Sequence, residues 1–309
     1  MTNYTRGLHE IGDGLFAYLQ PDGQWGFSNA GLVTAEDRSL LVDTLFDLKL
    51  TRQMLAEMAP HTLRRPIGTV VNTHANGDHC WGNQLVDRAE IIASARCATE
   101  MALVDPAMFA AFIRMEGLGK LGDYLKRIFG AFDFDGITVT PPTRTFQGEL
   151  TLEIGSRRVE LIEVGPAHTE GDVIVWLPSE RAVFTGDILF IEGTPIVWAG
   201  PIDNWIRACD RILALDARVI VPGHGPLTDA AGVRSVRDYL RFVSDEATKR
   251  FEAGMTVGDA VRDIALGAFS GWQDRERLAV NVNTRYRELD PSAAGASVPE
   301  LFAEMAKLT

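Results

Sequence analysis

Histidine and aspartate residues gather in three short segments of this chain. Residues 74 to 79 spell His-Ala-Asn-Gly-Asp-His, the second segment contains His168, and the third contains His224. Asp187, which ends a Phe-Thr-Gly-Asp run, adds a carboxylate between the second and third segments. Imidazole and carboxylate groups bind zinc or iron at neutral pH. These residue types, in this order, predict a two-metal centre with hydrolytic chemistry.

Several candidate ligands follow an apolar run that is typical of a strand. They are His74 after residues 70–71, His168 after the run that ends at Val164, Asp187 after 183–184, and His224 after 219–221. Strand ends in one layered sheet structure can converge on a single edge, and nearby glycines permit the tight turns that a site requires. We therefore expect these ligands to meet in space. His9 and His61 lack this context and are expected on the surface.

Strand and helix patterns alternate along the first part of the chain, as in an α/β layer. We expect strands at 15–20, 29–34, 39–42, 68–73, 91–94, 150–154, 159–164, 173–177, 182–184 and 219–221. Residues 21–27 form a Gly-rich hairpin loop. Helical spacing predicts helices at about 48–58 and 203–215, and throughout the chain after residue 229. One of these helices opens at Thr256, in an arrangement typical of an N-terminal cap.

The chain is expected to form one catalytic domain, residues 1–228, with a helical insertion and a helical extension. The insertion, residues 100–137, is apolar and forms either a lid or wall of the substrate pocket, or a face that packs on the domain or on a second subunit. The extension covers residues 229–309. It either packs on the same chain or builds the interface of a homodimer.

Four motifs of this chain resemble those of the metallo-β-lactamase-fold superfamily. They are the modified His-x-His-x-Asp-His segment at 74–79, the segment 165–172, Thr185-Gly186-Asp187, and Pro222-Gly223-His224-Gly225. The resemblance covers roughly residues 10 to 228. It implies an α/β fold, an αββα four-layer sandwich in which two mixed β-sheets lie between helical layers and the metals lie at one edge.

The resemblance also implies two metal sites that share one carboxylate. The first uses His74, the residue at 76 and His168, the second uses Asp78, His79 and His224, and Asp187 bridges them. Asn76 stands where the family pattern has histidine, and an amide oxygen is a poorer zinc ligand than imidazole. We therefore expect one or two zinc ions per chain, with the second site filling first. Asn76 either ligates through its oxygen, with water, or only donates hydrogen bonds.

The expected reaction is hydrolysis of an ester, thioester or lactone, and less readily of an amide. A metal lowers the pKa of bound water from ~15.7 to about 7, and the resulting hydroxide attacks the carbonyl. Asp78 is the candidate catalytic residue, because a carboxylate that is not fully engaged as a ligand orients the water or moves its proton. Trp25, Phe27 and Trp198 are candidates to contact an apolar part of a small organic substrate. Each is also compatible with a place in the core.

Two other functions fit the same ligands. His74, His168 and Asp187 form the two-histidine, one-carboxylate set of non-haem iron oxygenases. Because the superfamily includes persulfide dioxygenases, a mononuclear iron oxidoreductase is the first alternative. The second is a metal-bound sensor or binding protein with little turnover. One iron per chain favours the oxygenase, whereas full metal loading without turnover favours the sensor.

The amino-acid composition limits which partners and which cellular compartment we expect for this protein. The formal net charge of −12 argues against nucleic acid, because phosphate binding requires a basic face. No apolar stretch approaches the ~20 residues needed to span a membrane. Three cysteines, Cys80, Cys97 and Cys209, suit a reducing compartment better than a disulfide framework. We expect a cytoplasmic protein with a small-molecule partner.

Overall fold

The first β-sheet contains seven strands in the spatial order β1-β2-β3-β4-β5-β6-β7. Neighbours from β1 to β4 are antiparallel, whereas β4 to β7 run parallel. The strands are β1 (Gly7–Gly12), β2 (Leu15–Leu19), β3 (Ala30–Thr34), β4 (Ser39–Val42), β5 (Ile67–Val71), β6 (Glu90–Ser94) and β7 (Arg144–Phe146). This computed structural model describes residues 4–21, 24–292 and 295–309, so Asp22 and Gly23 of the expected hairpin loop lie outside the described residues.

The second β-sheet contains five strands in the order β12-β11-β10-β9-β8. All of its neighbours are antiparallel except β11 and β12, which run parallel. The strands are β8 (Glu149–Ile154), β9 (Arg157–Glu163), β10 (Val173–Leu177), β11 (Ala182–Phe184) and β12 (Val219–Val221). Both sheets are therefore mixed, which confirms the fold class that the resemblance implied.

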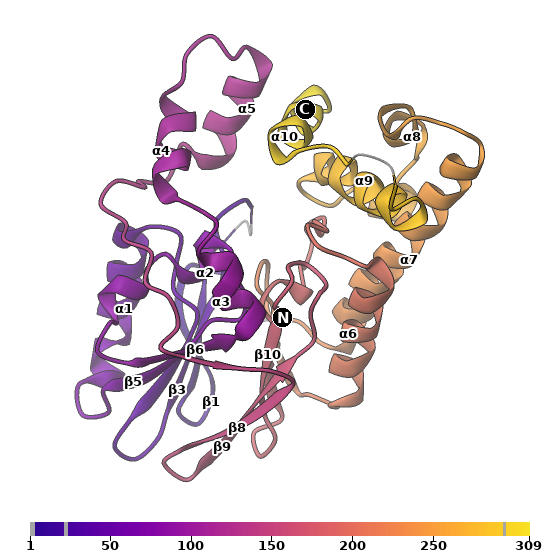
Figure 1. Cartoon of the computed structure of the whole chain (residues 1–309). Coiled ribbons are helices and arrows are strands. Elements are labelled where there is room, and N and C mark those ends of the chain that lie inside the picture. Colours follow the sequence, from indigo (N-terminus) through magenta and orange to yellow (C-terminus); the bar gives the residue numbers. More distant parts are fainter. Residues whose placement is uncertain (1–3, 22–23, 293–294) are drawn as a thin grey trace.

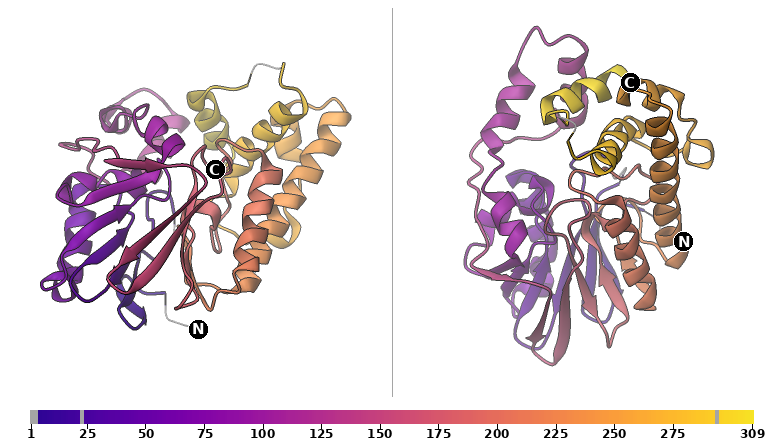
Figure 2. Two further views of the ribbon diagram at one scale, coloured as in Figure 1. Left: turned by 60° about the horizontal axis from the view of Figure 1, so that its bottom comes forward. Right: turned by 45° about the vertical axis from the view of Figure 1, so that its right-hand side comes forward.

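Helices cover the outer faces of both sheets (Figures 1 and 2). α1 and α3 lie over the seven-stranded sheet, while α6 lies over the five-stranded sheet and packs against α7. The elements are α1 (Leu48–Thr62), α2 (Gly77–Cys80), η1 (Asn83–Leu85), α3 (Ala95–Met101), η2 (Gly186–Ile188), α6 (Ile202–Ala214) and α7 (Ala230–Glu252). Asp47 caps α1 by accepting a hydrogen bond from the Leu50 amide at 2.6 Å.

The strands are apolar on both faces because each sheet lies between the other sheet and a helical layer. On β2, Leu15 and Leu19 belong to the cluster between the sheets, which also contains Val175 of β10. The intervening Phe16 and Tyr18 belong to the cluster that includes helix residues. Such two-sided burial replaces the alternation of polar and apolar residues that is typical of a one-sided sheet. The result is a four-layer sandwich.

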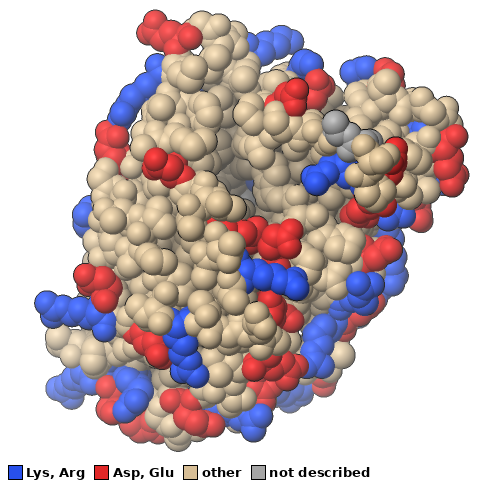
Figure 3. Space-filling model, in the orientation of Figure 1, with Lys and Arg blue, Asp and Glu red and all other residues tan. Residues whose placement is uncertain are grey.

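Two helices of the insertion project from the sandwich as an arm (Figure 1), and the C-terminal helices reach it from the other side. The elements are α4 (Pro106–Arg114), α5 (Lys120–Phe129), α8 (Val257–Asp263), η3 (Gly267–Phe269), η4 (Arg275–Arg277), α9 (Leu278–Leu289) and α10 (Val298–Lys307). α10 packs against α5, where the Tyr124 hydroxyl donates to the sulfur of Met305 at 3.6 Å. The molecular surface is hollowed between the arm and the C-terminal helices (Figure 3).

Two strands were not predicted from the sequence. β1 is an edge strand whose side chains are mostly half-buried, and β7 is only three residues long, so neither shows an apolar run. The strand expected at 68–73 spans Ile67–Val71, so Asn72 and Thr73 lie between its end and His74. The expected cap of α8 is confirmed, because the Thr256 hydroxyl accepts from the Asp259 amide at 3.2 Å. Within the described ranges, no helix is long and apolar enough to cross a membrane.

Candidate metal centre

Three of the expected ligands occupy equivalent positions at the carboxyl ends of parallel strands. His74 follows Val71, the last residue of β5, by three positions. Asp187 and His224 lie at the same offset from the ends of β11 and β12. Because β11 and β12 are neighbouring parallel strands, their following turns emerge at one edge of the sheet. His168 reaches this edge from the connection between β9 and β10.

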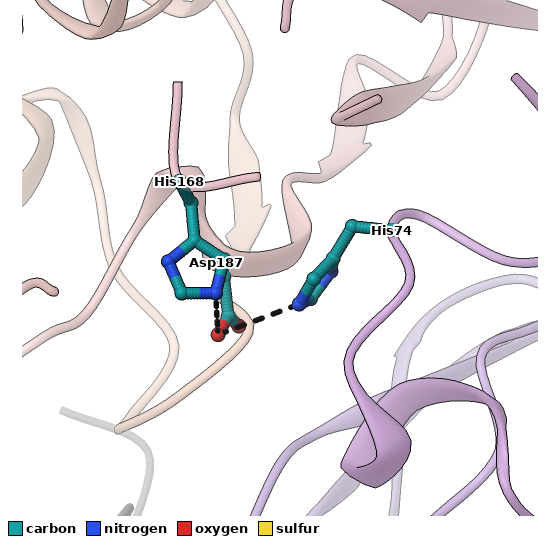
Figure 4. A group of neighbouring side chains, drawn as sticks. All are labelled: His74, His168 and Asp187. Atoms are coloured by element: carbon teal, nitrogen blue, oxygen red, sulfur yellow. Dashed lines mark ion pairs between the residues drawn. The ribbon is translucent and has the colours of Figure 1, made fainter. Parts of the chain in front are cut away.

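The first cluster consists of His74, His168 and Asp187, all buried, with ligand atoms within 4.8 Å of one another. Figure 4 shows both imidazole rings directed at the carboxylate. Asp187 Oδ2 lies 3.3 Å from Nε2 of His168 and 3.7 Å from Nε2 of His74. The sequence prediction that these three residues meet is therefore matched by their positions.

The second cluster consists of Asp78, His79 and His224, also buried and within the same 4.8 Å limit. Nε2 of His224 lies 3.3 Å from Oδ2 of Asp78. Asp187 reaches this cluster as well, because its Oδ1 lies 3.1 Å from Nε2 of His79 and its Oδ2 lies 3.4 Å from Nε2 of His224. One carboxylate thus lies between two groups of ligand atoms, which is the geometry of a bridging ligand.

Several polar atoms at the centre are buried without a hydrogen-bond partner. Among the described side chains, these include Nε2 of His74, Nε2 of His79 and Oδ1 of Asp187. Leaving a buried polar atom unpaired costs about 1–3 kcal/mol, so a protein rarely gathers several in one place. A cation between the atoms removes the deficit, because each atom offers it a lone pair. The donor set, imidazole with carboxylate, fits zinc or iron.

Hydrogen bonds to the outer ring nitrogens turn the inner nitrogens toward the clusters. Nδ1 of His168 lies 2.7 Å from the backbone carbonyl of Ile196, and a carbonyl can only accept, so Nδ1 carries the proton. Nδ1 of His79 faces Asp43 at 2.9 Å, and Nδ1 of His74 faces the Thr73 hydroxyl at 3.0 Å. Such partners fix the tautomer of a metal-binding histidine and leave Nε2 unprotonated, with its lone pair on the side of the cluster.

Asp43 is the functional residue that the sequence reasoning missed. It follows β4 directly, and its amide donates to the carbonyl of Val71 on neighbouring β5. Its carboxylate accepts from the amide and hydroxyl of Thr73, each at 2.7 Å, besides facing His79. Its backbone is left-handed, with φ of 62°, a conformation that costs a non-glycine residue energy. The signal was present, since an aspartate after a buried strand repeats the pattern of the ligands.

Burial and the carboxylates divide the histidines into two groups. Burial lowers the pKa of His74 and of His168 below its usual value. At His224, burial also acts to lower the pKa. The carboxylates of Asp187 and Asp78 outweigh this effect and raise the pKa to about 9. The same balance raises the pKa of His79. The second cluster therefore attracts positive charge, either as protons or as a cation in their place.

Asn76 occupies the N-cap position of α2, where an asparagine side chain commonly caps a helix. Its side chain makes no capping hydrogen bond. The side-chain nitrogen instead lies 2.8 Å from Nε2 of His168, on the edge of the first cluster. Asparagine is common at this position because its side chain can accept a hydrogen bond from the first turn of the helix. The absence of that hydrogen bond indicates that the amide has another role. Asn76 is half-buried and lies within reach of the cluster, either as a ligand or as a hydrogen-bonding neighbour.

Close packing fixes the loop that carries His224. A Cβ on Gly223 would lie 2.0 Å from Oδ1 of Asp187, so only glycine leaves room for the bridging carboxylate. Asn29, a buried residue before β3, holds the other side of this loop. Its side-chain nitrogen donates to the carbonyls of Pro222 and Gly225, at 3.0 and 2.8 Å. Neither contact was predicted from the sequence.

The candidate substrate-binding aromatics differ in burial. Trp25 is 9% exposed and lies 4.3 Å from the Arg277 guanidinium, inside the aromatic core, whereas Phe27 and Trp198 are half-buried. Trp198 is close to the first cluster, since its amide donates to the His168 carbonyl at 3.1 Å. A cavity of about 490 Å³ is lined by Arg127 of α5, by residues between Val261 of α8 and Leu278 at the start of α9, and by the C-terminal residues Leu308 and Thr309, rather than by the residues of the two clusters.

The remaining histidines and cysteines lie outside the two clusters. His9 is half-buried on the edge strand, and half-buried His61 packs on the ring of Phe16. The Cys80 thiol, although it follows His79, donates to backbone carbonyls, and burial raises its pKa well above the usual value. Cys97 and Cys209 are also buried thiols. These groups are structural in this arrangement.

Comparisons with known proteins place this geometry in a wider context. A family model described as Metallo-beta-lactamase superfamily matches residues 23–224, which include every ligand of both clusters. The 2,4-dinitroanisole O-demethylase subunit alpha of Nocardioides sp. (strain JS1661) is 25% identical over 287 residues, which are 91% of this chain and 68% of that protein. The linear primary-alkylsulfatase of Pseudomonas sp. (strain ATCC 19151) is 24% identical over 264 residues, 76% of this chain and 49% of the relative.

Solved structures share the fold at low sequence identity. The stereoselective inverting sec-alkylsulfatase Pisa1 from Pseudomonas sp. superposes with a TM-score of 0.68 and 16% identity, over 93% of this chain and 51% of that chain. A metallo-beta-lactamase from Pontibacter korlensis gives a TM-score of 0.58 and 20% identity, over 77% of this chain and 99% of that chain. The chain spans about half the length of the two alkylsulfatases.

Proposed function

The chain belongs to the metallo-beta-lactamase superfamily, and we propose that it is a metal-dependent hydrolase that cleaves an ester, thioester or lactone of a small organic molecule. The observation that carries this proposal is the position of Asp187 between two buried clusters of ligand atoms. Bound zinc supplies a Lewis acid and lowers the pKa of coordinated water to about 7. The relatives include a protein named hydroxyacylglutathione hydrolase from Methylococcus capsulatus, 28% identical over 155 residues.

The second cluster is the stronger site in this proposal. It has two imidazoles and two carboxylates, Asp78 and Asp187, whereas the first has two imidazoles, the shared carboxylate and Asn76. More anionic ligands attract a divalent cation more strongly, and an amide oxygen ligates zinc weakly. We therefore place one zinc in the second cluster first, and a second zinc in the first cluster at higher concentration.

Asp78 is the residue to which we assign proton movement. Its Oδ2 lies 3.3 Å from Nε2 of His224 and 3.9 Å from Nε2 of His79. Its side chain is 11% exposed, more than those of His79 and Asp187. The Ser28 hydroxyl donates to the Asp78 carbonyl at 2.5 Å and so holds the backbone of this residue. A fixed, slightly exposed carboxylate can orient the attacking water and accept its proton.

The substrate surface is assigned to aromatic side chains beside the clusters. Phe27 and Trp198 are the half-buried candidates, and the buried Trp25 shares a ring neighbour, Phe302, with Trp198. An apolar acyl or alkyl group suits these rings, and the formal net charge of −12 disfavours a nucleic acid. The acyl-thioester is the first substrate to test. An alkyl sulfate and a methyl aryl ether belong in the same panel, because two relatives are named for such substrates.

Metal analysis and turnover of matched variants test the proposed function. We expect purified protein to contain zinc and to hydrolyse at least one substrate of the panel. Asp78→Asn replaces a carboxylate by an amide, so it should weaken zinc binding at the second cluster, and it should lower kcat at least about a hundredfold even with zinc in excess, as loss of general-base catalysis does. His224→Ala should release zinc from the second cluster. Arg237→Met, which removes an ion pair between α7 and Asp210 of α6, is the control.

The competing functions predict different results. An iron oxygenase would contain one iron held by His74, His168 and Asp187, and would keep it after His224→Ala. A sensor would bind zinc fully and hydrolyse nothing in the panel. Either result would overturn the hydrolase proposal.

A further inference from the structure

Side chains of η4 and α9, in the C-terminal extension, form hydrogen bonds with one loop beside the metal centre. This segment, residues 194–197, is called the Ile196 loop below and lies between η2 and α6. The contacts are Arg277 Nη1 to the Thr194 carbonyl at 3.0 Å, Asn281 Nδ2 to the Pro195 carbonyl at 2.9 Å, the Val197 amide to Asn281 Oδ1 at 2.8 Å, and Thr284 Oγ1 to the Val197 carbonyl at 2.7 Å. These donors and acceptors lie more than eighty residues from the loop in sequence.

The side chain of Asn281 forms hydrogen bonds on both sides of Ile196. Its amide nitrogen bonds the residue before Ile196, and its amide oxygen bonds the residue after it. The carbonyl between these two contacts accepts from Nδ1 of His168 at 2.7 Å. One asparagine therefore fixes both ends of the backbone segment that orients a ligand of the first cluster.

The polarity of position 281 needs an explanation beyond packing. Asn281 is fully buried in the interior of α9, between the apolar residues Val280 and Val282. Asparagine is a weak helix former, and a buried amide costs free energy unless its hydrogen bonds are satisfied. Here the amide is satisfied by Pro195, Val197 and the hydroxyl of Tyr239, the last at 3.0 Å. Its bonds thus serve the Ile196 loop rather than the helix.

We propose that Asn281 is a positioning residue for the first metal cluster. By holding the Ile196 loop, it keeps the Ile196 carbonyl on Nδ1 of His168, fixes the proton there, and leaves the Nε2 lone pair facing Asp187. The proposal rests on the proposed metal centre and adds that the C-terminal extension is part of its support. Outer partners of metal ligands typically change metal affinity about 10–100-fold when they are removed.

Asn283 provides a matched control on the same helix. It is the same residue type, is 5% exposed, and accepts a hydrogen bond from the Ala296 amide at 3.4 Å, away from the Ile196 loop. Asn283→Ala therefore removes a buried amide from α9 without touching the support of His168. A general loss of α9 stability affects both variants, whereas loss of the positioning contact affects only Asn281→Ala.

The test reads the state of His168 directly in the full chain. Histidine-labelled protein is examined by nitrogen NMR, before and after dialysis against zinc, with His168→Gln used to assign the signal. In the parent and in Asn283→Ala we expect a single tautomer with the proton on Nδ1 and slow exchange of that proton. In Asn281→Ala we expect a mixture of tautomers, proton exchange at least about tenfold faster, and zinc affinity of the first cluster lower by about 10–100-fold.

Thr284→Val keeps the test decisive if Asn281→Ala does not fold. This nearly isosteric change removes one hydrogen bond to the Ile196 loop, and we expect a smaller acceleration of the same proton. An unchanged His168 signal in the folded Asn281→Ala protein, or in Thr284→Val if that is the variant that folds, overturns the proposal. An equal change in Asn283→Ala does the same. Because these signals need no turnover, failure to find a hydrolysed substrate would reject the proposed function and leave this result standing.

Discussion

At the scale of single residues, the two clusters differ at Asn76, which lies only beside the first. Asn76 offers an amide where the resemblance implies an imidazole, and its side-chain nitrogen lies 2.8 Å from Nε2 of His168 without capping its own helix. The first cluster therefore has two strong neutral ligands, a shared carboxylate and one weak position. This composition explains why the two clusters should bind zinc with different affinities.

Asn76→His should restore the first cluster. Imidazole nitrogen is a better zinc ligand than amide oxygen, so we expect affinity at this cluster to rise about tenfold or more and the zinc content to approach two per chain. Elemental analysis and titration against a chelator measure both quantities. Asn76→Ala is the companion variant, with affinity at or below that of the parent. Equal zinc affinity in the parent and Asn76→His would show that position 76 does not face the metal.

At the scale of elements, the centre is built from turns that follow strands. The turns after β11 and β12 are so close that the Gly223 position lies against the carboxylate of Asp187. Phe190, on the segment that follows η2, stacks on the imidazole of His224 with 3° between the rings and centroids 5.0 Å apart. Arg277 lies over the same phenyl ring at 5.3 Å. Ring stacking therefore supports His224 of the second cluster, whereas a backbone carbonyl supports His168 of the first.

Gly223→Ala should displace the bridging carboxylate. The added Cβ would lie 2.0 Å from Oδ1 of Asp187 and 2.6 Å from the carbonyl carbon of Gly186, so one turn must move. Because Asp187 serves both clusters, we expect zinc affinity to fall at both, by about tenfold or more. Gly193→Ala is the control, since its Cβ would meet nothing within 4 Å. Normal zinc content in Gly223→Ala would contradict the bridging role.

At the scale of the whole molecule, the ligands come from both sheets and hold them together at one edge. β5 belongs to the seven-stranded sheet and carries His74, while β11 and β12 belong to the five-stranded sheet. The Val173 amide of β10 also donates to the Thr73 carbonyl at 2.8 Å, joining the sheets beside the centre. A metal that binds ligands from both sheets stabilises the folded chain, because the unfolded chain cannot gather them.

Removing zinc should therefore lower the melting temperature, and the difference should depend on pH. The raised pKa values of His224, about 9, and of His79 mean that protons compete with zinc at neutral pH. Below these pKa values, zinc must displace a proton from each histidine. For each such proton, the zinc affinity falls tenfold, or about 1.4 kcal/mol, with every unit by which the pH is lowered. We expect the stabilisation by zinc to be largest near pH 9 and to shrink toward pH 6. Differential scanning calorimetry with and without a chelator measures this stabilisation as a difference in melting temperature. A difference that stays constant from pH 6 to pH 9 would contradict the competition between protons and zinc.

The sequence by itself determined the layered α/β fold and the residues that meet in the two clusters. His74, Asp187 and His224 could be identified because each follows a strand within a few residues, and local spacing is enough to place a side chain at a strand end. Tertiary structure alone decided which side chains support those ligands. Asn281 meets Val197 across 84 residues, and Asn29 meets Pro222 across 193, so no local pattern records either contact. Hydrogen-bond partners depend on which elements pack together, and that is fixed only when the chain has folded.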